Sequence, residues 1–332
     1  MKYENIYSLF RERADRYGAR PVFYARQEGL WEPVSWAALH REALDFGCGL
    51  IAGGLRPGAS VCILMGNVTG WPAADLGTIM ARGVSVGLYP TASPEQCRYI
   101  IDHSDAEFVL VDTPGQLEKI LKVRDRLPKV KAIIARDGAA ELPDGAIGYR
   151  KFVETGRENH DEALADLRSR AESARAEETA IMVYTSGTTG QPKGARLSHR
   201  YVIKSVESLL ETIPLAETDV AFSYLPFCHV AERISGLYTR LYAGATAYFV
   251  DDPAKLWDYM QEVGPTVFAS LPRFFEKAHA RIMSDADASG PGRKGLFEEA
   301  LKRGREISRL RQEGEPVPGQ LMGEYERVAP PF

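Results

Sequence analysis

The sequence predicts a protein of the α/β class in which mostly parallel sheets are sandwiched between helices. Short apolar runs alternate with amphipathic helical patterns along most of the 332 residues. Most of these runs lack the apolar–polar alternation of a half-exposed strand, which indicates strands buried on both faces of a parallel sheet. Hydrophobic residues make up 45% of the chain and charged residues 26%, the balance of a globular protein with a substantial core.

The first predicted helix follows Ser35. Its apolar residues recur at spacings of three and four, which places them on one face of a helix. They are Trp36, Leu39, Ala43, Phe46 and Leu50. The pair Gly53-Gly54 ends this helix, and Pro57-Gly58 turns the chain into an apolar strand at residues 61–65.

The sequence signals the start of one helix near residue 94 in detail. A helix is expected over residues 71–82 and a strand over 84–89, and Ser93 then stands before Pro94. Ser93 is suited to the N-cap position, Pro94 to the first helical position, and Gln96 completes a capping box. A helix therefore begins at Pro94.

The same rules assign the remainder of the chain. Strands are predicted at residues 108–111, 132–135, 181–184, 220–225, 245–250 and 266–270, and helices at 115–126, 161–174 and 296–311. Residues 137–150 are rich in Gly, Ala and Asp, and residues 284–295 read SDADASGPGRKG, so both are predicted as loops. The last residues, 327–332, carry no recognisable closing element.

Charge and cysteine content exclude several classes of function. The net charge is −4 and the pI about 6.0, so no basic surface points to nucleic acid as a partner. The four cysteines form no C-x-x-C pair, which indicates neither a zinc site nor a disulfide framework. No window approaches the ~20 apolar residues of a membrane span. These features favour a cytoplasmic protein and leave peripheral membrane contact open; they predict no oligomeric state.

The segment that carries chemistry is YTSGTTGQPKG at residues 184–194. It follows the strand predicted at 181–184 and precedes a helix whose N-cap is expected to be Ser198. Glycines allow backbone N–H groups to turn inward and form an anion-binding concavity. The Thr and Ser hydroxyls add short donors, and Lys193 adds a mobile positive charge. Such a loop suits a polyphosphate.

Two other interpretations of this segment fail. A P-loop places its lysine directly after the last glycine, whereas Lys193 comes three residues after Gly190. A flexible Ser/Thr/Gly linker would have no reason to place Pro-Lys-Gly shortly after Gly-Thr-Thr-Gly.

The eleven residues YTSGTTGQPKG resemble the signature loop of the adenylate-forming superfamily, which includes acyl-CoA synthetases, luciferases and peptide-synthetase adenylation domains. Residues 195–199 also resemble the family's turn into its next helix. Three further segments are similar to long-chain acyl-CoA synthetases, the bubblegum-like branch among them. They are residues 83–105, SYLPFCHVAER at 223–233 and LPRFFEK at 271–277. The resemblance covers the chain from about residue 7 to about residue 325.

The resemblance implies ATP-dependent activation of a long-chain fatty acid. A carboxylate attacks the α-phosphate of MgATP, and the thiol of coenzyme A then displaces AMP from the acyl-adenylate. The β- and γ-phosphates would be held by Thr185, Ser186, Gly187, Thr188, Thr189, Gly190 and Lys193, and Thr185 would also contribute to the Mg²⁺ site. Preorganised donors of this kind are each worth about 10²–10³ in rate.

Two histidines and one serine are further candidates for functional residues. By resemblance, His229 lies where the acyl channel meets the adenylation centre; the alternative is a histidine that hydrogen-bonds locally at a helix start. His229 and Glu232 form only a weak metal-binding pattern. His199 fits a helix cap better than a catalytic dyad. Finally, GVSVG at residues 83–87 matches the nucleophile elbow of α/β-hydrolases, but Ser85 lies between two valines in a predicted strand.

The family pattern also continues past Phe332. The chain lacks the family's Y-G-x-T-E element, the ribose-binding aspartate and the small C-terminal domain with its lysine. The expected organisation is one partial AMP-binding domain over 1–332, with portions 1–180, 181–283 and 284–332. The isolated polypeptide is therefore expected not to form acyl-adenylate at a useful rate, and fatty-acid-dependent ATP–pyrophosphate exchange would contradict this. The alternatives are a non-catalytic nucleotide-binding fragment and a ligase for another carboxylate.

Overall fold

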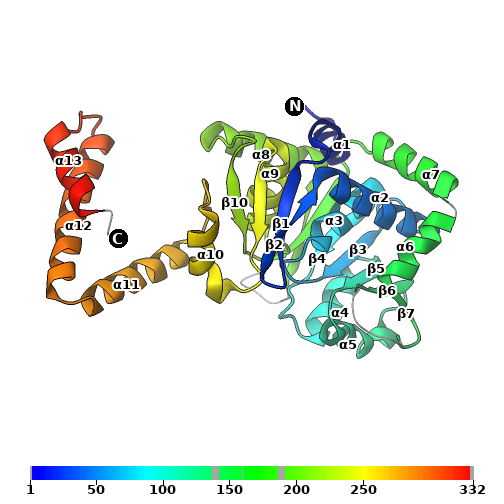
Figure 1. The fold of residues 1–332 in the computed structure, drawn as a ribbon. Helices are drawn as coiled ribbons and strands as arrows, with labels where there is room; N and C mark the ends of the chain where they lie inside the picture. The colour runs from blue at the N-terminus through cyan, green and yellow to red at the C-terminus, as the bar shows by residue number, and fades with distance from the viewer. Residues whose placement is uncertain (1, 137–141, 159, 186–190, 330–332) are drawn as a thin grey trace. The chain divides into compact units, whose positions relative to one another are not determined.

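The computed structural model describes residues 2–136, 142–158, 160–185 and 191–329. Two compact units divide the chain, one over Met1–Phe268 and the other over Ala269–Phe332. The larger unit contains two β-sheets and the helices around them, and the smaller unit contains helices (Figure 1). The class is α/β, as the sequence predicts.

The larger sheet has seven strands in the order β7-β6-β5-β3-β4-β8-β9. Every neighbouring pair is parallel except β8 and β9, which are antiparallel. The strands are β3 (Ser60–Leu64), β4 (Val84–Gly87), β5 (Ala106–Val111), β6 (Ala132–Ala135), β7 (Ala146–Gly148), β8 (Thr179–Thr185) and β9 (Lys193–Ser198).

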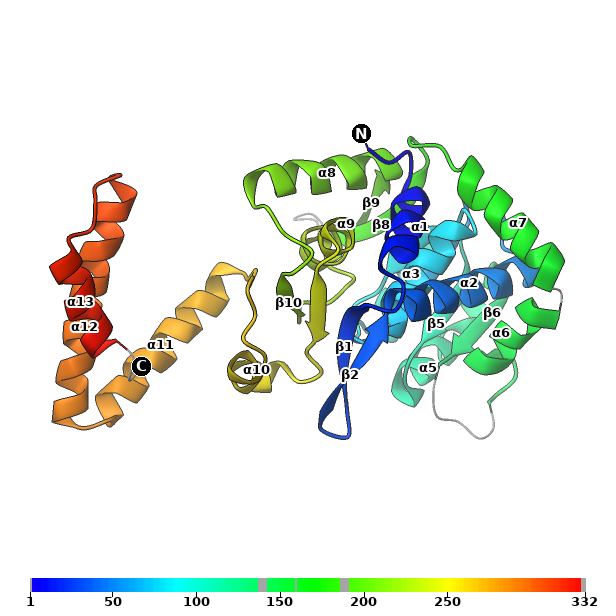
Figure 2. The same cartoon turned by 45° about the horizontal axis from the view of Figure 1, so that its top comes forward.

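Both faces of this sheet are covered, which explains its continuous apolar runs. Along β3, Val61 and Ile63 belong to one hydrophobic core, whereas Cys62 and Leu64 belong to a second core on the opposite face. The first face is covered by α1 (Ile6–Tyr17), α2 (Trp36–Ala52), α3 (Gly70–Met80), α6 (Tyr149–Glu158) and α7 (His160–Ser173), and the second by α4 (Pro94–His103) and α5 (Pro114–Leu121) (Figures 1 and 2). Parallel strands require this double cover.

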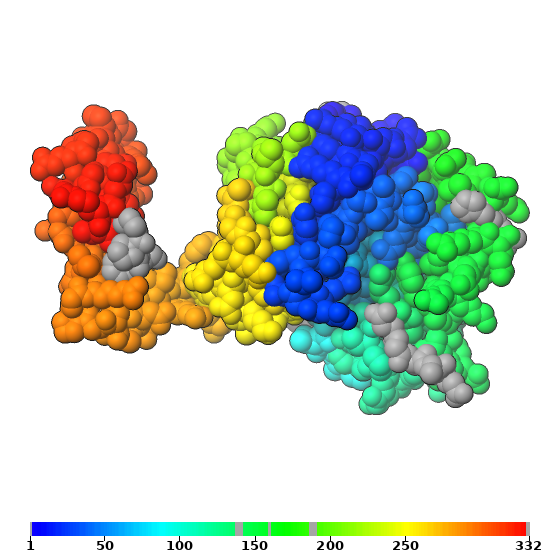
Figure 3. Space-filling view, viewed as in Figure 1, coloured from blue at the N-terminus to red at the C-terminus, as the bar shows by residue number. Residues whose placement is uncertain are grey.

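The smaller sheet joins the start of the chain to residues far along it. Its order is β10-β11-β1-β2, formed by β10 (Val220–Ser223), β11 (Thr246–Phe249), β1 (Pro21–Gln27) and β2 (Leu30–Ser35). The hairpin β1–β2 turns at Glu28 and Gly29, which both have positive φ, and β1 pairs in parallel with β11. In Figure 3 this hairpin lies beside α10 (Leu256–Val263), and Arg26 forms an ion pair with Glu262. The sequence analysis did not predict the hairpin.

Several predicted elements are confirmed. Helix α2 buries all five residues that the periodicity selects. At α4, Ser93 accepts a hydrogen bond from the backbone N–H of Gln96 while the Gln96 side chain accepts one from the Ser93 N–H, which completes the predicted capping box with Pro94 at the first turn. Ser198 likewise caps α8 (His199–Thr212) by accepting from the N–H of Tyr201.

Other predictions were wrong. Residues 193–198 form strand β9, where the sequence predicts only a loop and a helix cap, because backbone pairing with β8 stabilises a strand that has no buried residue. The predicted loop at 137–150 contains β7 and the start of α6 in its described part. The predicted strand at 266–270 is reduced to one bridge between Val267 and Ala221.

The smaller unit corrects two more predictions. Helix α11 (Pro272–Ala288) continues into the predicted loop at 284–295 as far as Ala288, because Ala and exposed Asp are tolerated in a helix. Only Ser289 and Gly290 separate it from α12 (Pro291–Gln312), and Gly290 has φ of 87°. Helix α13 (Gly319–Val328), also unexpected, packs on α12 through an ion pair between Arg303 and Glu324. No helix among the described residues is both long and apolar enough to cross a membrane.

Candidate functional site

The two described ends of the signature segment lie at the carboxyl edge of the parallel sheet. Strand β8 ends at Thr185, and its neighbour β4 ends at Gly87. Asn67 lies just beyond the end of β3, which pairs with β4 on its other side. Open α/β sheets bind ligands in the crevice outside the carboxyl ends of their strands. This edge is therefore the expected place for a ligand.

Two of the predicted phosphate-binding residues face each other. In the antiparallel pair β8–β9, Thr185 is the register partner of Lys193, and Tyr184 is the partner of Gly194. The side chains of Thr185 and Lys193 are exposed. The hairpin thus places a hydroxyl and an ammonium group at the two ends of the segment that joins its strands. The predicted ligands Ser186, Gly187, Thr188, Thr189 and Gly190 lie outside the described residues.

Helix α4 holds both ends of this segment. The hydroxyl of Tyr99 donates a hydrogen bond of 3.1 Å to the carbonyl oxygen of Pro192, and His103 Nδ1 shares a hydrogen bond of 2.8 Å with the Tyr184 hydroxyl. The Tyr99 and His103 rings pack with centroids 5.3 Å apart. Burial raises the pKa of Tyr184 well above its ordinary value, so its hydroxyl stays protonated.

Sequence reasoning missed these two α4 residues. Their i, i+4 spacing on a helix with a predicted start places them on one face, which was the available signal. Their contacts with Pro192 and Tyr184 depend on the fold and cannot be predicted from the spacing.

His229 lies in the turn that follows β10. Its ring Nδ1 accepts a hydrogen bond of 3.1 Å from the backbone N–H of Ala231, and the backbone N–H of His229 donates to the carbonyl oxygen of Pro226 at 2.9 Å. The turn reaches the edge described above: the Asn67 side chain donates to the Leu225 carbonyl oxygen at 2.7 Å. The local hydrogen bond at a helix start, which the sequence left as one alternative, is thus present at His229.

Gly87 permits this close approach. An added Cβ at Gly87 would lie 2.7 Å from the Cα of Cys228, the residue before His229. The turn that carries His229 therefore packs directly against the end of β4. The Cys228 thiol is buried, which raises its pKa to about 12 and leaves it unreactive near neutral pH.

Glu232 does not pair with His229. Its buried carboxylate accepts a hydrogen bond of 2.7 Å from the Ser223 hydroxyl and forms an ion pair with Arg240. These partners leave no role for an H-x-x-E metal pair. Across the part of the chain that the structure describes, no group of three His, Cys, Asp or Glu residues is placed to hold a metal ion.

Ser85 and His199 are structural residues. Ser85 lies within β4 and is fully buried, and the chain forms no helix after it until Pro94, so the hydrolase interpretation fails. His199 begins α8, and its Nδ1 accepts a hydrogen bond of 3.3 Å from the backbone N–H of Ile6. Burial lowers the pKa of His199 to about 4.

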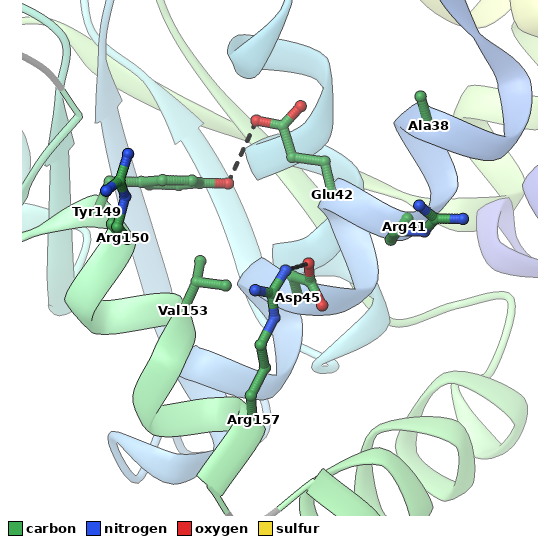
Figure 4. A pocket seen from close by; sticks show the side chains of 8 residues that line it. All are labelled: Ala38, Arg41, Glu42, Asp45, Tyr149, Arg150, Val153 and Arg157. Atoms are coloured by element: carbon green, nitrogen blue, oxygen red, sulfur yellow. Dashed lines mark hydrogen bonds and ion pairs between the residues drawn. The ribbon is translucent and has the colours of Figure 1, made fainter.

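A separate surface cavity lies between α2 and α6, with a volume of about 370 Å³ (Figure 4). The Tyr149 hydroxyl points to Glu42, and Arg157 points to Asp45, to which it is ion-paired. Glu42 also pairs with Arg136 at 2.6 Å. The acidic side chains of this cavity are thus neutralised by the protein itself.

The seven-stranded α/β sheet, with the two described ends of the YTSGTTGQPKG segment at its carboxyl edge, has the architecture of the adenylate-forming fold. The family model for AMP-binding enzymes matches residues 10–331, and the chain belongs to this family.

Two similar curated proteins are long-chain-fatty-acid–CoA ligases. The chain is 33% identical over 285 residues to the long-chain-fatty-acid–CoA ligase ACSBG2 of Xenopus laevis, a match that covers 83% of this chain and 38% of that protein. It is 33% identical over 293 residues to the human long-chain-fatty-acid–CoA ligase ACSBG1, with 86% and 40% covered. The chain thus spans about two fifths of the length of these curated relatives.

Solved structures confirm the fold. The anthranilate CoA ligase AuaEII in complex with anthranoyl-AMP aligns with a TM-score of 0.69 at 19% identity, over 80% of this chain and 49% of that one. The N-terminal domain of FACL13 from Mycobacterium tuberculosis aligns with a TM-score of 0.66 at 22% identity, over 82% and 64%.

Proposed function

We propose that this chain forms the phosphate-binding part of an enzyme that activates a long-chain fatty acid with ATP and transfers the acyl group to coenzyme A. The observation that carries the proposal is the pairing of Thr185 with Lys193 across β8 and β9, in a chain whose curated relatives are long-chain-fatty-acid–CoA ligases.

The roles follow from the chemistry of the reaction. Attack of a carboxylate oxygen on the α-phosphorus breaks the bond to pyrophosphate, so negative charge builds on the leaving phosphates. Lys193 supplies a positive charge to these oxygens, and the residues from Ser186 to Gly190 supply hydroxyl and backbone donors. His229 lies in a turn at the same sheet edge and serves the carboxylate side of the reaction.

Of the two paired residues Thr185 and Lys193, only Thr185 carries a group suited to Mg²⁺. A hard cation prefers oxygen ligands, and Thr185 offers an exposed hydroxyl opposite Lys193. Bound Mg²⁺ would neutralise phosphate charge there, with the phosphate oxygens as its main ligands. Coenzyme A serves as the acyl acceptor in the second step.

Nucleotide binding tests the proposal. Lys193→Ala is expected to weaken MgATP binding by about tenfold or more, because it removes a charge-assisted hydrogen bond worth ~1.5–3 kcal/mol. AMP binding should change little, since AMP lacks the β- and γ-phosphates. Isothermal titration calorimetry measures both, and Lys193→Arg should retain part of the MgATP affinity.

Lys302→Ala is the control, because Lys302 is an exposed lysine of α12. Equal losses for MgATP and AMP, or no loss for either, would contradict the assignment of Lys193. The class of carboxylic acid substrate is tested by competition between two analogues, a long-chain fatty-acyl sulfamoyl-adenosine and a benzoyl sulfamoyl-adenosine. Preference for the benzoyl compound would favour a ligase for another carboxylate.

A further inference from the structure

The hydrogen bond at His229 defines which of its nitrogens carries the proton. Nδ1 lies 3.1 Å from the backbone nitrogen of Ala231, which can only donate. Nδ1 must therefore present its lone pair. A neutral imidazole that accepts at Nδ1 carries its proton on Nε2 and donates from there. The ring is half-buried, so its Nε2–H can donate a hydrogen bond to a ligand.

The backbone on both sides of this ring is held in place. The backbone carbonyl oxygen of His229 accepts a hydrogen bond of 3.0 Å from the backbone N–H of Arg233. The backbone N–H of His229 donates to the carbonyl oxygen of Pro226. Phe227, two residues earlier, stacks on Trp71 of α3 with ring centroids 4.9 Å apart. The ring of His229 thus projects from a fixed turn.

The turn is anchored by a buried group of charges. The guanidinium of Arg233 forms an ion pair with Asp75 of α3, and both side chains are fully buried. Arg233 also donates to the carbonyl oxygen of Ser85 in β4 at 3.2 Å, and its guanidinium lies 5.0 Å from the centre of the Trp71 ring. The Tyr238 hydroxyl donates to the second carboxylate oxygen of Asp75 at 2.6 Å.

The helix that contains these residues has π geometry. Segment η2 (Ala231–Tyr238) starts two residues after His229. A π-helix repeats its hydrogen bonds at i and i+5, so residues five apart come into line. Arg233 and Tyr238 are five apart, and both reach Asp75. Such segments are rare and concentrate at functional sites. The ion pair thus depends on the same backbone geometry that places Ala231 N–H against His229.

We propose that Arg233, anchored on Asp75, is a positioning residue that holds His229 as a hydrogen-bond donor through Nε2–H, directed at a carboxylate or acyl oxygen of the substrate. The assignment of the oxygen rests on the proposed function. A fatty acid is already ionised near pH 7, as carboxyl groups with pKa near 4 are, so its attack on phosphorus needs no base. A donor that orients the carboxylate suits this chemistry, and a general base does not.

The tautomer is measured directly by ¹⁵N NMR of the histidine side chains in the 332-residue chain, with His229→Gln to assign the signals. We expect a pyridine-type Nδ1 and a pyrrole-type Nε2 for His229 near neutral pH. A proton on Nδ1 would overturn the inference, whatever the protein does with nucleotides.

The anchor is tested with two mild variants. Arg233→Lys keeps the charge without the planar guanidinium, and Tyr238→Phe removes one hydroxyl; both are expected to shift the His229 nitrogen signals toward the average of the two tautomers. Glu107→Gln is the matched control. It removes the charge of another buried carboxylate, which lies on β5 and pairs with Arg56 and Lys131, away from His229. Unchanged His229 signals in both variants would refute the positioning role, and measurement in folded Tyr238→Phe keeps the test valid should Arg233→Lys unfold.

A third measurement separates this inference from the proposed function. On addition of dodecanoyl sulfamoyl-adenosine, an analogue of an acyl-adenylate, the His229 Nε2 signal is expected to shift while Nδ1 stays pyridine-type. Binding without any shift of Nε2 would overturn the assigned contact. Absence of binding would instead count against the proposed function and against an acyl oxygen as the partner, while the tautomer result stands by itself.

Discussion

The Tyr99 hydroxyl on α4 donates a hydrogen bond of 3.1 Å to the carbonyl oxygen of Pro192, the residue before Lys193. This bond ties the start of β9 to a helix on the face of the sheet opposite α2. Because Thr185 and Lys193 are register partners, whatever fixes one end of the hairpin also fixes the other. Tyr99 is thus part of the support for the phosphate-binding residues.

Removal of that hydroxyl should weaken both the fold and nucleotide binding. Tyr99→Phe is expected to lower the free energy of unfolding by about 1 kcal/mol, the usual cost of one hydrogen bond, and to reduce MgATP affinity more than AMP affinity. Urea unfolding and calorimetry measure the two effects. Tyr201→Phe, at an exposed tyrosine of α8, serves as the control and should change neither. Equal behaviour of the two variants would argue against a role for Tyr99.

The buried imidazole of His199 predicts acid sensitivity. Its pKa is lowered to about 4 by burial, whereas an unfolded histidine titrates near 6.5, so the unfolded state binds more protons between these values. Stability should therefore fall as pH drops from about 6.5 to about 4, by roughly 3 kcal/mol at most from this group.

The measurement for His199 is urea unfolding as a function of pH. His199→Gln should flatten the dependence between pH 6.5 and 4, although it also costs stability at pH 7. His279→Gln, at an exposed histidine of α11, should leave the slope unchanged. A wild-type slope in His199→Gln would show that other groups cause the acid sensitivity. Glu178, with a pKa lowered to about 2 chiefly by its bond to Arg82, acts in a lower window, from about 4.5 downward.

Ser85 offers a test of the rejected hydrolase interpretation. Its hydroxyl is buried and has no hydrogen-bond partner among the described residues. Ser85→Ala should therefore change the free energy of unfolding by less than about 1 kcal/mol, and a fluorophosphonate probe should not label the protein. Ser223→Ala is the contrast, since it removes a hydrogen bond to buried Glu232 and should cost about 1–3 kcal/mol. Labelling that Ser85→Ala abolishes would revive the hydrolase.

Gly87 is expected to tolerate no side chain. Its added Cβ would lie 2.7 Å from the Cα of Cys228 and 2.8 Å from its Cβ, so Gly87→Ala should destabilise the protein by about 1–3 kcal/mol and displace the turn of His229. Gly115→Ala in α5, where nothing lies within 4 Å, should instead stabilise by up to ~1 kcal/mol. Thermal unfolding compares the two, and equal effects would refute the close approach.

Local signals in the sequence were enough for the elements whose stability is local. The periodicity from Trp36 to Leu50 and the capping box at Ser93 each depend on neighbours in the chain, and both are confirmed. The apolar runs of the parallel sheet were also readable, because both faces of each strand are buried.

What the sequence missed depends on distant partners. Strand β9 has few apolar residues and exists because it pairs with β8. The pairing of Asp75 with Arg233 joins residues on different elements, and no spacing along the chain predicts it. For the candidate site, the sequence named Thr185, Lys193 and His229, but the supports at Tyr99, His103 and Gly87 came from the fold alone.

The parallel pairing of β1 with β11 has a consequence for synthesis on the ribosome. Phe23 cannot meet its partner Ala247 until the second of them has been made. At roughly 5–20 residues per second, the edge of β1 that pairs with β11 stays open for on the order of 10–45 s. Chaperones that bind nascent chains would find their substrate in this interval, at the N-terminal hairpin.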